Sequence, residues 1–398
     1  MTDGRGGQQD GQHDGGLRRA LRLGAPAAAL VSALALSGCT EASEAPAEAE
    51  AEGVATAPTN APGASAAPLT GSFAPAGEPE VLAEGLDVPW SVAVLADGAV
   101  LVSERDTGRV LELADGALRE VGVVPGVQAR GEGGLLGLAA LETDGERWLY
   151  AMHTSAEDNR IVRMPLSGSA GSAAIGDAEP VLTGIVSAGT HNGGRLAFGP
   201  DGKLYATTGD AQDRPSSQDP ASLGGKILRL EPDGSVPADN PTPGSPVYTL
   251  GHRNPQGLAW DSTGQLWASE FGQDTWDELN RIEPGGNYGW PEVEGQAGAE
   301  GFIDPIAQWS PADASPSGLA AVGDSLYLAA LRGERLWRIE TGDPVETVAY
   351  FPEEFGRLRD AVLAPDGQSL LVLTNNTSGD SPNPGDDRLL RIPLAPEG

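Results

Sequence analysis

The sequence places ionisable or polar side chains directly after six short apolar runs. They are Glu104-Arg105, His153, Gly209-Asp210, Glu270, Leu331-Arg332 and Asn375. If the runs are equivalent strands of a repeated unit, their ends meet at one end of the fold and these side chains converge there. Such convergence indicates a binding or catalytic site better than any single motif does, although polar residues after strands are also common in ordinary loops.

Two other segments carry residues that are suited to chemistry. His191 begins the segment His191-Asn192-Gly193-Gly194-Arg195-Leu196, and histidine is a base that is neutral near pH 7. Arg357 and Arg359 lie in an Arg-x-Arg-Asp segment. Guanidinium groups bind carboxylates as planar forks, and on a strand a spacing of two residues puts both side chains on one face.

The elements that would position these residues are short strands. A polar turn precedes four or five mostly apolar residues at six places, which begin at Asp97-Gly98, Asp144-Gly145, Asp201-Gly202, Thr263-Gly264, Gly323-Asp324 and Asp366-Gly367. The copies recur at intervals of roughly 45 to 60 residues, a period that suits propeller blades of four strands each. No helical pattern of adequate length separates them. We therefore predict an all-β fold, a six-bladed β-propeller with four-stranded antiparallel blades.

Composition supports one folded domain and excludes some partners. The chain has 398 residues, of which 39% are hydrophobic, and 57 Asp and Glu stand against 25 Lys and Arg for a net charge of -32. This charge would repel nucleic acid and anionic membrane surfaces, so neither is expected to bind the folded part. The 56 Gly and 32 Pro favour a turn-rich β protein.

The N-terminal residues resemble an export signal of the lipoprotein type. Basic residues are followed by the apolar run from Leu23 to Leu36, which is too short to span a membrane comfortably. The run ends in Leu36-Ser37-Gly38-Cys39, which resembles a bacterial lipobox and contains the only cysteine. We expect residues 1–38 to be a signal peptide and Cys39 to carry a lipid anchor on the outer face of the bacterial cell membrane. An ordinary signal peptide with a chance cysteine is the alternative.

Residues 39–76 are rich in Ala, Glu, Pro, Thr and Ser and contain almost no large apolar side chain. Such a segment cannot bury enough apolar surface to offset the entropy lost on ordering. We expect a disordered tether there, and a catalytic propeller domain over residues 77–398.

Several segments of the propeller region resemble the glucose/sorbosone dehydrogenase family, the soluble aldose sugar dehydrogenases that depend on pyrroloquinoline quinone (PQQ). The matching segments, in chain order from about Glu80 to Pro393, are Leu86-Asp87-Val88-Pro89-Trp90, Gly131-Glu132-Gly133-Gly134-Leu135-Leu136-Gly137, the His191 segment, Gly251-His252-Arg253-Asn254-Pro255-Gln256-Gly257, Glu270-Phe271-Gly272, Trp276-Asp277-Glu278-Leu279-Asn280, Gly285-Gly286-Asn287-Tyr288-Gly289-Trp290-Pro291 and Arg357-Leu358-Arg359-Asp360. Each is a weak pattern, but their shared order over some three hundred residues is specific.

The resemblance implies a catalytic base, His191, with Asp210 fixing its tautomer and Arg253 as a further catalytic residue. His252 would support the Arg253 loop instead. The resemblance also implies that PQQ, a planar tricarboxylate, is held by Glu132, His191, Arg253, Asn254, Arg332, Arg357 and Arg359.

The family also binds calcium, chiefly through backbone carbonyl groups. The matching positions are Gly272 and Gln273, and a second calcium is suggested by Glu278 and Tyr288, where a solvated glutamate and a packed tyrosine are the alternative. Hard oxygen ligands of this kind suit calcium.

Three positions depart from the glucose-oxidising members of the family. Glu132 stands for a glutamine, Thr190 for an aspartate and Arg332 for a lysine. The first two put glucose specificity in doubt and favour the broader aldose dehydrogenase branch.

The implied activity is oxidation of an aldose at C1 to a lactone with PQQ and calcium, followed by electron transfer to an external acceptor. Two alternatives share the architecture: a calcium-dependent sugar lactonase, and a propeller that binds a ligand without catalysis. The arginine set argues against the lactonase, which holds no tricarboxylate.

Overall fold

The computed structural model describes residues 69–143, 145–379 and 382–397. The predicted signal peptide, the lipid-anchor residue Cys39 and most of the predicted tether lie outside these residues.

The described strands form six antiparallel sheets, and five of them follow the chain order. The first contains β3 (Pro89–Val94), β4 (Val100–Glu104), β5 (Arg109–Ala114) and β6 (Ala117–Val123); the second β7 (Leu135–Thr143), β8 (Glu146–Thr154), β9 (Asn159–Ser167), β10 (Ala174–Ile175) and β11 (Glu179–Ile185). The third contains β12 (Leu196–Phe198), β13 (Leu204–Thr208), β14 (Lys226–Leu230) and β15 (Val247–Leu250); the fourth β16 (Pro255–Trp260), β17 (Leu266–Glu270), β18 (Asp277–Ile282) and β19 (Ala307–Trp309). The fifth contains β20 (Pro316–Val322), β21 (Ser325–Ala330), β22 (Arg335–Glu340) and β23 (Glu346–Tyr350).

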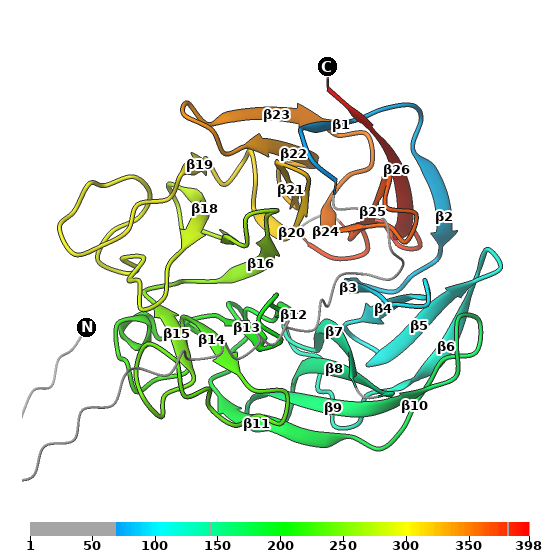
Figure 1. Ribbon diagram of the computed structural model, residues 1–398, viewed down its shortest axis with the longest axis horizontal. Coiled ribbons are helices and arrows are strands. Elements are labelled where there is room, and N and C mark those ends of the chain that lie inside the picture. The colour runs from blue at the N-terminus through cyan, green and yellow to red at the C-terminus, as the bar shows by residue number, and fades with distance from the viewer. Residues whose placement is uncertain (1–68, 144, 380–381, 398) are drawn as a thin grey trace, which may run out of the picture. The chain divides into compact units, whose positions relative to one another are not determined.

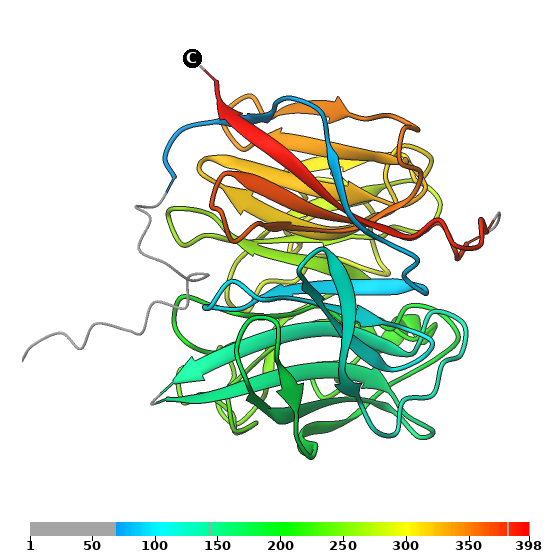
Figure 2. The same ribbon diagram turned by 90° about the vertical axis from the view of Figure 1, so that its right-hand side faces the viewer.

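The sixth sheet joins both ends of the described chain. It contains β24 (Leu358–Leu363), β25 (Ser369–Thr374) and β26 (Arg388–Pro396), and β26 pairs with β1 (Phe73–Pro75) and β2 (Glu80–Glu84). Figure 2 shows the blue N-terminal strands beside the red β26. This pairing completes the sixth sheet with strands from both ends of the described chain and so ties the last blade to the segment that precedes the first.

The domain boundary predicted at residue 77 is therefore too late. Phe73 is buried, and β1 pairs with Leu394–Pro396. The local composition suggested a tether because β1 is short and takes most of its partners from the other end of the chain.

The predicted six-bladed β-propeller is confirmed. Each blade is four strands deep, and the outermost position is shared by β10 and β11 in the second blade and by β1 and β2 in the sixth. Each of the six apolar runs after a turn is the second strand of its blade. Figure 1 looks along the axis of the ring, with the innermost strands β3, β7, β12, β16, β20 and β24 nearest the centre. Adjacent innermost strands contact one another around the ring.

The core of the described part lies between blades. Six apolar clusters each join two neighbouring sheets; Leu101 with Leu149 and Leu228 with Met152 are examples. Burying one such leucine contributes about 1.5 to 3 kcal/mol. Each blade is thus held mainly by its neighbours, which leaves the loops at the ends of the ring free to carry function.

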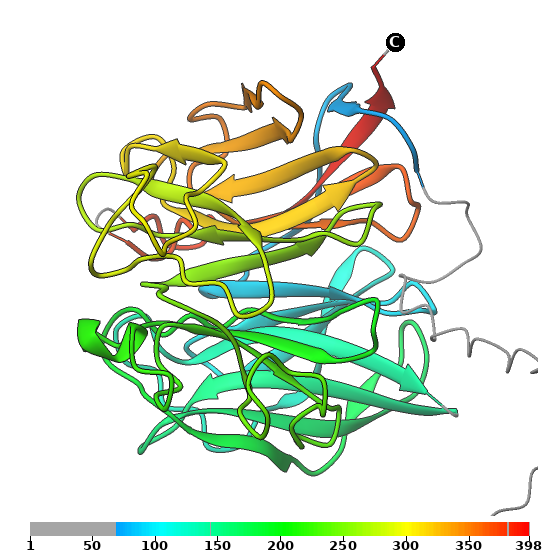
Figure 3. The same ribbon diagram turned by 60° about the vertical axis from the view of Figure 1, so that its left-hand side comes forward.

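The loops that precede the innermost strands and follow the second strands lie at one end of the ring. The 3-10 turn η1 (Arg214–Ser217) lies at this end, and Figure 3 shows it at the left edge with the C-terminus at the right. Among the described residues the structure contains no helix that is long and apolar enough to cross a membrane.

Candidate active site

A cavity of about 290 Å³ opens among these loops. It is lined by Glu132, His191, Arg253, Asn254, Phe271, Gly272, Gln273, Asp277, Pro311, Ser315, Arg332, Arg357 and Gly379. The lining residues come from five blades, so the cavity is formed by the ring of blades together and not by one sheet. Eight of the residues predicted from the sequence to form a site are among them.

His191 and Asp210 form a hydrogen-bonded pair at this cavity. The His191 Nδ1 atom lies 2.7 Å from Asp210 Oδ1, and the His191 side chain is 18% exposed whereas that of Asp210 is fully buried. Burial acts to raise the pKa of Asp210, but its bonds with His191 and with the Gln212 amide hold that pKa below its usual range. The carboxylate can only accept, so Nδ1 donates and Nε2 is the basic nitrogen.

The second oxygen of Asp210 also has a donor. The Trp290 indole Nε1 lies 2.9 Å from Asp210 Oδ2, and the Gln212 amide donates to Oδ1 at 2.8 Å. The carboxylate is therefore fixed at both oxygens, and with it the orientation of the imidazole of His191.

The backbone at His191 adopts the left-handed conformation, with φ of 59°. This conformation costs energy in a residue other than glycine and is maintained by its surroundings. The Glu132 carboxylate accepts from the His191 amide at 2.9 Å, and Asn254 Oδ1 accepts from Gly193 at 2.9 Å. A side chain at Gly209 would meet the His191 carbonyl oxygen at 2.0 Å, so only glycine allows this close approach.

The Arg253 loop is supported from behind by a second histidine. His252 Nδ1 lies 2.7 Å from Glu270 Oε2, and the other oxygen of Glu270 accepts from the Arg253 amide. His252 is fully buried and its Nε2 lies 2.8 Å from the Thr249 hydroxyl. His252 therefore has the supporting position expected from the sequence.

Arg253 is half-buried and lines the cavity, and its guanidinium group lies over the Trp290 ring, 5.6 Å from the ring centroid. Burial lowers the pKa of Arg253, although the negative charges of Asp210, Glu270 and Glu132 oppose this effect. Its Nε atom is buried without a hydrogen-bond partner among the described residues.

Arg359 does not line the cavity; it lies in the innermost strand β24, two residues after the cavity-lining Arg357. Its Nη1 atom donates to Gln256 Oε1 at 2.8 Å and lies 3.3 Å from the Ser317 hydroxyl, and Nη2 lies 3.4 Å from Asn375 Oδ1. Burial and the neighbouring charge of Arg357 lower the pKa of Arg359 to about 9. Among the described residues no carboxylate forms an ion pair with it.

Arg357 and Arg359 both lie at the start of the sixth blade. Arg357 precedes β24 and lines the cavity, whereas Arg359 lies within β24, at a register shift between Leu358 and Asp360. The shared strand face stays a prediction, and the two guanidinium groups are near enough for the charge of Arg357 to lower the pKa of Arg359.

Gly272 and Gln273, the predicted calcium ligands, line the cavity. The Gly272 amide donates to Asp277 Oδ1 at 2.9 Å, and the Gln273 amide donates to Glu294 Oε1 at 2.6 Å. A side chain at Gly272 would meet the Trp276 carbonyl oxygen at 1.6 Å. Burial raises the pKa of Asp277 to about 6. Two carboxylates thus hold this loop tightly against the cavity.

Glu278 and Tyr288, proposed for a second calcium, do not line the cavity. Burial and the neighbouring Glu270 raise the pKa of Glu278 to about 8, and the buried Asn280 Oδ1 has no hydrogen-bond partner among the described residues. The Tyr288 hydroxyl is already engaged with Arg281 and Glu283. Among the described residues no group of three or more His, Cys, Asp or Glu side chains is arranged to hold a metal ion.

Other strand-end residues have structural partners. Glu104 is buried and accepts from the Asp87 amide and the Arg109 guanidinium. His153 is buried, and burial lowers its pKa. Of the residues named at the six strand ends, Arg332 lines the cavity and Asp210 binds the cavity-lining His191.

Sequence reasoning missed the roles of Trp290 and Gln256, although both lie in segments that were matched. A useful signal is spacing: Gln256, Ser317 and Arg359 each follow a cavity-lining residue by two positions. All three lie at a register shift near the start of an innermost strand.

Comparison with known proteins agrees with this geometry. The model of the Glucose / Sorbosone dehydrogenase family matches residues 86–390. Aldose sugar dehydrogenase YliI of Escherichia coli is 30% identical over 76% of this chain and 91% of that protein. Quinoprotein glucose dehydrogenase B of Acinetobacter calcoaceticus is 34% identical over 56% of this chain and 54% of that protein.

Among solved structures, the PQQ-bound form of aldose sugar dehydrogenase from Streptomyces coelicolor is 49% identical, with a TM-score of 0.76. The similarity covers 83% of this chain and 100% of that one. Since the family model spans most of the chain and the fold and cavity agree with it, this chain belongs to the glucose/sorbosone dehydrogenase family.

Proposed function

We propose that the protein oxidises aldose sugars at C1 to lactones, using PQQ and calcium, and passes the electrons to an external acceptor. The observation that carries the proposal is the position of the His191–Asp210 pair beside Arg253 and Arg359, neither of which forms an ion pair with a carboxylate of the described residues. The relatives named above act on sugars, and one of them is a PQQ-bound form.

The residues present fit a planar tricarboxylate. Arg359 is buried among neutral oxygens only, and Arg253 and Arg359 each keep a buried Nε without a partner among the described residues. A buried cation without a counter-ion is costly, and carboxylate groups of a ligand would relieve that cost. Arg253, Arg332, Arg357 and Arg359 would hold the cofactor from several blades, which restricts its orientation.

The donors expected for calcium also fit. Gly272 and Gln273 line the cavity, and their main-chain carbonyl groups would supply the hard oxygen ligands that calcium prefers. Asp277, whose pKa burial raises to about 6, adds a negative charge nearby when it ionises. At the second position, Glu278 and the unpartnered oxygen of Asn280 would supply the side-chain donors, with Tyr288 limited to its carbonyl oxygen because its hydroxyl is engaged.

When bound, PQQ supplies the acceptor for the hydride that leaves C1 of the sugar. The chain supplies the base: His191 Nε2 removes the proton of the C1 hydroxyl while its Nδ1 hydrogen is held by Asp210. The ionised Asp210 stabilises the imidazolium that results. Glu132 and Asn254 hold the His191 loop, so the base is in place before the sugar binds.

The test is reconstitution of the purified protein with PQQ and calcium, followed by dye reduction with a panel of aldoses. We expect dye reduction that requires both PQQ and calcium, with lactone as product. Lactone hydrolysis without PQQ would favour the lactonase alternative, and uptake of neither PQQ nor calcium would favour a binding module.

We also propose that the protein is exported and anchored through a lipid on Cys39. The support is the apolar run that ends in Leu36-Ser37-Gly38-Cys39. Mass spectrometry of the native protein should find a lipidated N-terminus at Cys39, and Cys39→Ala should release an active protein. An unmodified N-terminus at another residue would refute the anchor.

A further inference from the structure

We propose that Trp290 is a positioning residue that keeps the imidazole of His191 in one tautomer by fixing the Asp210 carboxylate. This inference rests on the proposed role of His191 as the base. The indole donates to Asp210 Oδ2 at 2.9 Å, while Asp210 Oδ1 binds His191. Asp210 is fully buried, so no solvent replaces the indole as a donor.

The position of Trp290 is itself set by surrounding groups. Its amide donates to the Gly251 carbonyl at 2.9 Å, and its carbonyl accepts from the Gln218 side chain at 2.7 Å. Two guanidinium groups lie over its ring, with Arg214 5.2 Å and Arg253 5.6 Å from the ring centroid. The indole can therefore rotate little, and its N–H remains directed at Asp210.

Trp290 thus has two separable functions. The ring face contacts Arg253, one of the groups proposed to hold the cofactor, and the ring N–H holds the carboxylate that orients the base. Substitution by phenylalanine keeps an aromatic face for Arg253 but removes the N–H. The loss of a residue that orients a functional imidazole typically lowers activity by roughly 10- to 100-fold.

The test is Trp290→Phe, with Trp267→Phe as the matched control. Trp267 is also buried, and its indole donates to Asp261 Oδ2 at 2.8 Å, but Asp261 binds no histidine among the described residues and accepts otherwise from Thr263 and Gln265. We expect Trp290→Phe to lower kcat about 10-fold while the PQQ dissociation constant changes by less than about 3-fold. Trp267→Phe should leave kcat at the wild-type value.

The decisive readout is the tautomer of His191 in the apoprotein, measured by NMR with ¹⁵N-labelled histidine. The chain has only four histidines, so the spectrum is simple. Neutral His191 should carry its proton on Nδ1 in the wild type and in Trp267→Phe, and should be a mixture of tautomers in Trp290→Phe. Wild-type tautomer and kcat in Trp290→Phe, or equal losses of kcat and PQQ affinity, would overturn the proposal.

A measurement on the wild-type apoprotein covers the case in which Trp290→Phe does not fold. The Trp290 indole N–H resonance should shift with pH at the same midpoint as His191, because both bind Asp210, whereas the Trp267 resonance should not follow it. An unresponsive Trp290 resonance would refute the coupling. These readouts need no cofactor, so they are independent of the base assignment itself, which would fail if His191→Ala retained turnover.

Discussion

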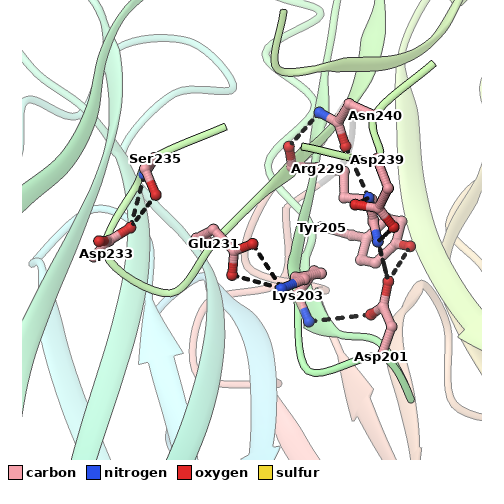
Figure 4. Close-up of polar contacts among 9 residues, drawn as sticks. All are labelled: Asp201, Lys203, Tyr205, Arg229, Glu231, Asp233, Ser235, Asp239 and Asn240. Carbon is pink, nitrogen blue, oxygen red and sulfur yellow. Dashed lines mark hydrogen bonds and ion pairs between the residues drawn. The ribbon is translucent and has the colours of Figure 1, made fainter. Parts of the chain in front are cut away.

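Two buried arginines of the ring, Arg229 and Arg359, differ in whether a carboxylate neutralises their charge. In the third blade, Arg229 donates to Asp201 at 2.9 Å and to Asp239 at 2.8 Å, and the Tyr205 hydroxyl also donates to Asp201 (Figure 4). Burial acts against the charge of Arg229, but its carboxylate partners raise its pKa above the ordinary value. Arg359, in contrast, has only neutral oxygens near its guanidinium group, and its pKa falls to about 9.

Paired and unpaired arginines also occur side by side near the axis of the ring. Arg195 and Arg359 both lie over the Trp90 ring, 4.6 and 5.7 Å from its centroid. Arg195 forms an ion pair with Asp360 at 2.7 Å, whereas Arg359, the residue before Asp360 in the chain, forms none among the described residues. A charge neutralised within the protein stabilises the fold, and one left without a counter-ion is available to a ligand.

The largest expected effect distinguishes the His191–Asp210 pair from the His252–Glu270 pair. In both pairs the histidine Nδ1 lies 2.7 Å from a carboxylate oxygen. His191→Ala should lower kcat by roughly two to four orders of magnitude while PQQ and calcium still bind, because a general base is lost but the arginines proposed to hold the cofactor remain. Single-turnover kinetics and cofactor titration measure the two quantities separately.

The control is His252→Gln, which keeps a polar group against Glu270. It should lower thermal stability or PQQ affinity more than the rate of the chemical step. If His252→Gln abolished proton transfer while His191→Ala remained active, the two pairs would have to exchange roles.

Next in size is the contrast between the two arginine environments. Arg359→Met should weaken PQQ binding by about 2 to 5 kcal/mol, since ligand carboxylates lose their partner. The apoprotein should be as stable as the wild type or more so, because an uncompensated buried charge is removed. Fluorescence titration with PQQ and thermal unfolding test the two halves.

Arg229→Met should do the opposite. Removing the partner of Asp201 and Asp239 should cost about 1 to 3 kcal/mol of stability, while the PQQ dissociation constant stays unchanged. Equal effects of Arg229→Met and Arg359→Met on cofactor binding would end the distinction between structural and ligand-binding arginines.

A smaller effect concerns the acidic side chains. Burial and Glu270 raise the pKa of Glu278 to about 8, so the folded state binds a proton that the unfolded state has released. Without calcium, stability should therefore fall as pH rises from about 4.5 to 8. Glu278→Gln should remove part of this slope and raise the Tm of calcium-free protein at pH 8 by a few degrees, roughly 2 to 4 °C.

Calcium provides the control for this prediction. If a cation binds Glu278, calcium should raise the Tm of the wild type at pH 8 more than at pH 5, and should do so less in Glu278→Gln. A calcium effect that is independent of pH and of Glu278 would place no cation at this position.

The smallest effect is expected at Arg332, which lines the cavity but is exposed. Arg332→Lys keeps the charge, and solvent screens an exposed pair, so PQQ binding should change by less than about 1 kcal/mol. The change should shrink further at high salt. A loss as large as that of Arg359→Met would mean that burial does not set the strength of these contacts.

The sequence by itself determined the blades. Turn residues followed by apolar runs predicted the second strand of every blade, because strand formation depends on a local period of two and on local turn chemistry. Family motifs then located eight residues of the cavity, since those residues lie in loops whose spacing from the strands is short. The roles of these residues stay predictions.

The tertiary structure alone decided which charges are matched. Arg195 and Asp360 are 165 positions apart, and Trp290 and Asp210 are 80 apart, so no local pattern relates them. The same holds for β1, whose partner β26 lies at the other end of the chain. These contacts exist only after the ring closes and brings the innermost strands to one axis, and for that reason local composition misplaced the domain boundary and left the role of Trp290 unseen.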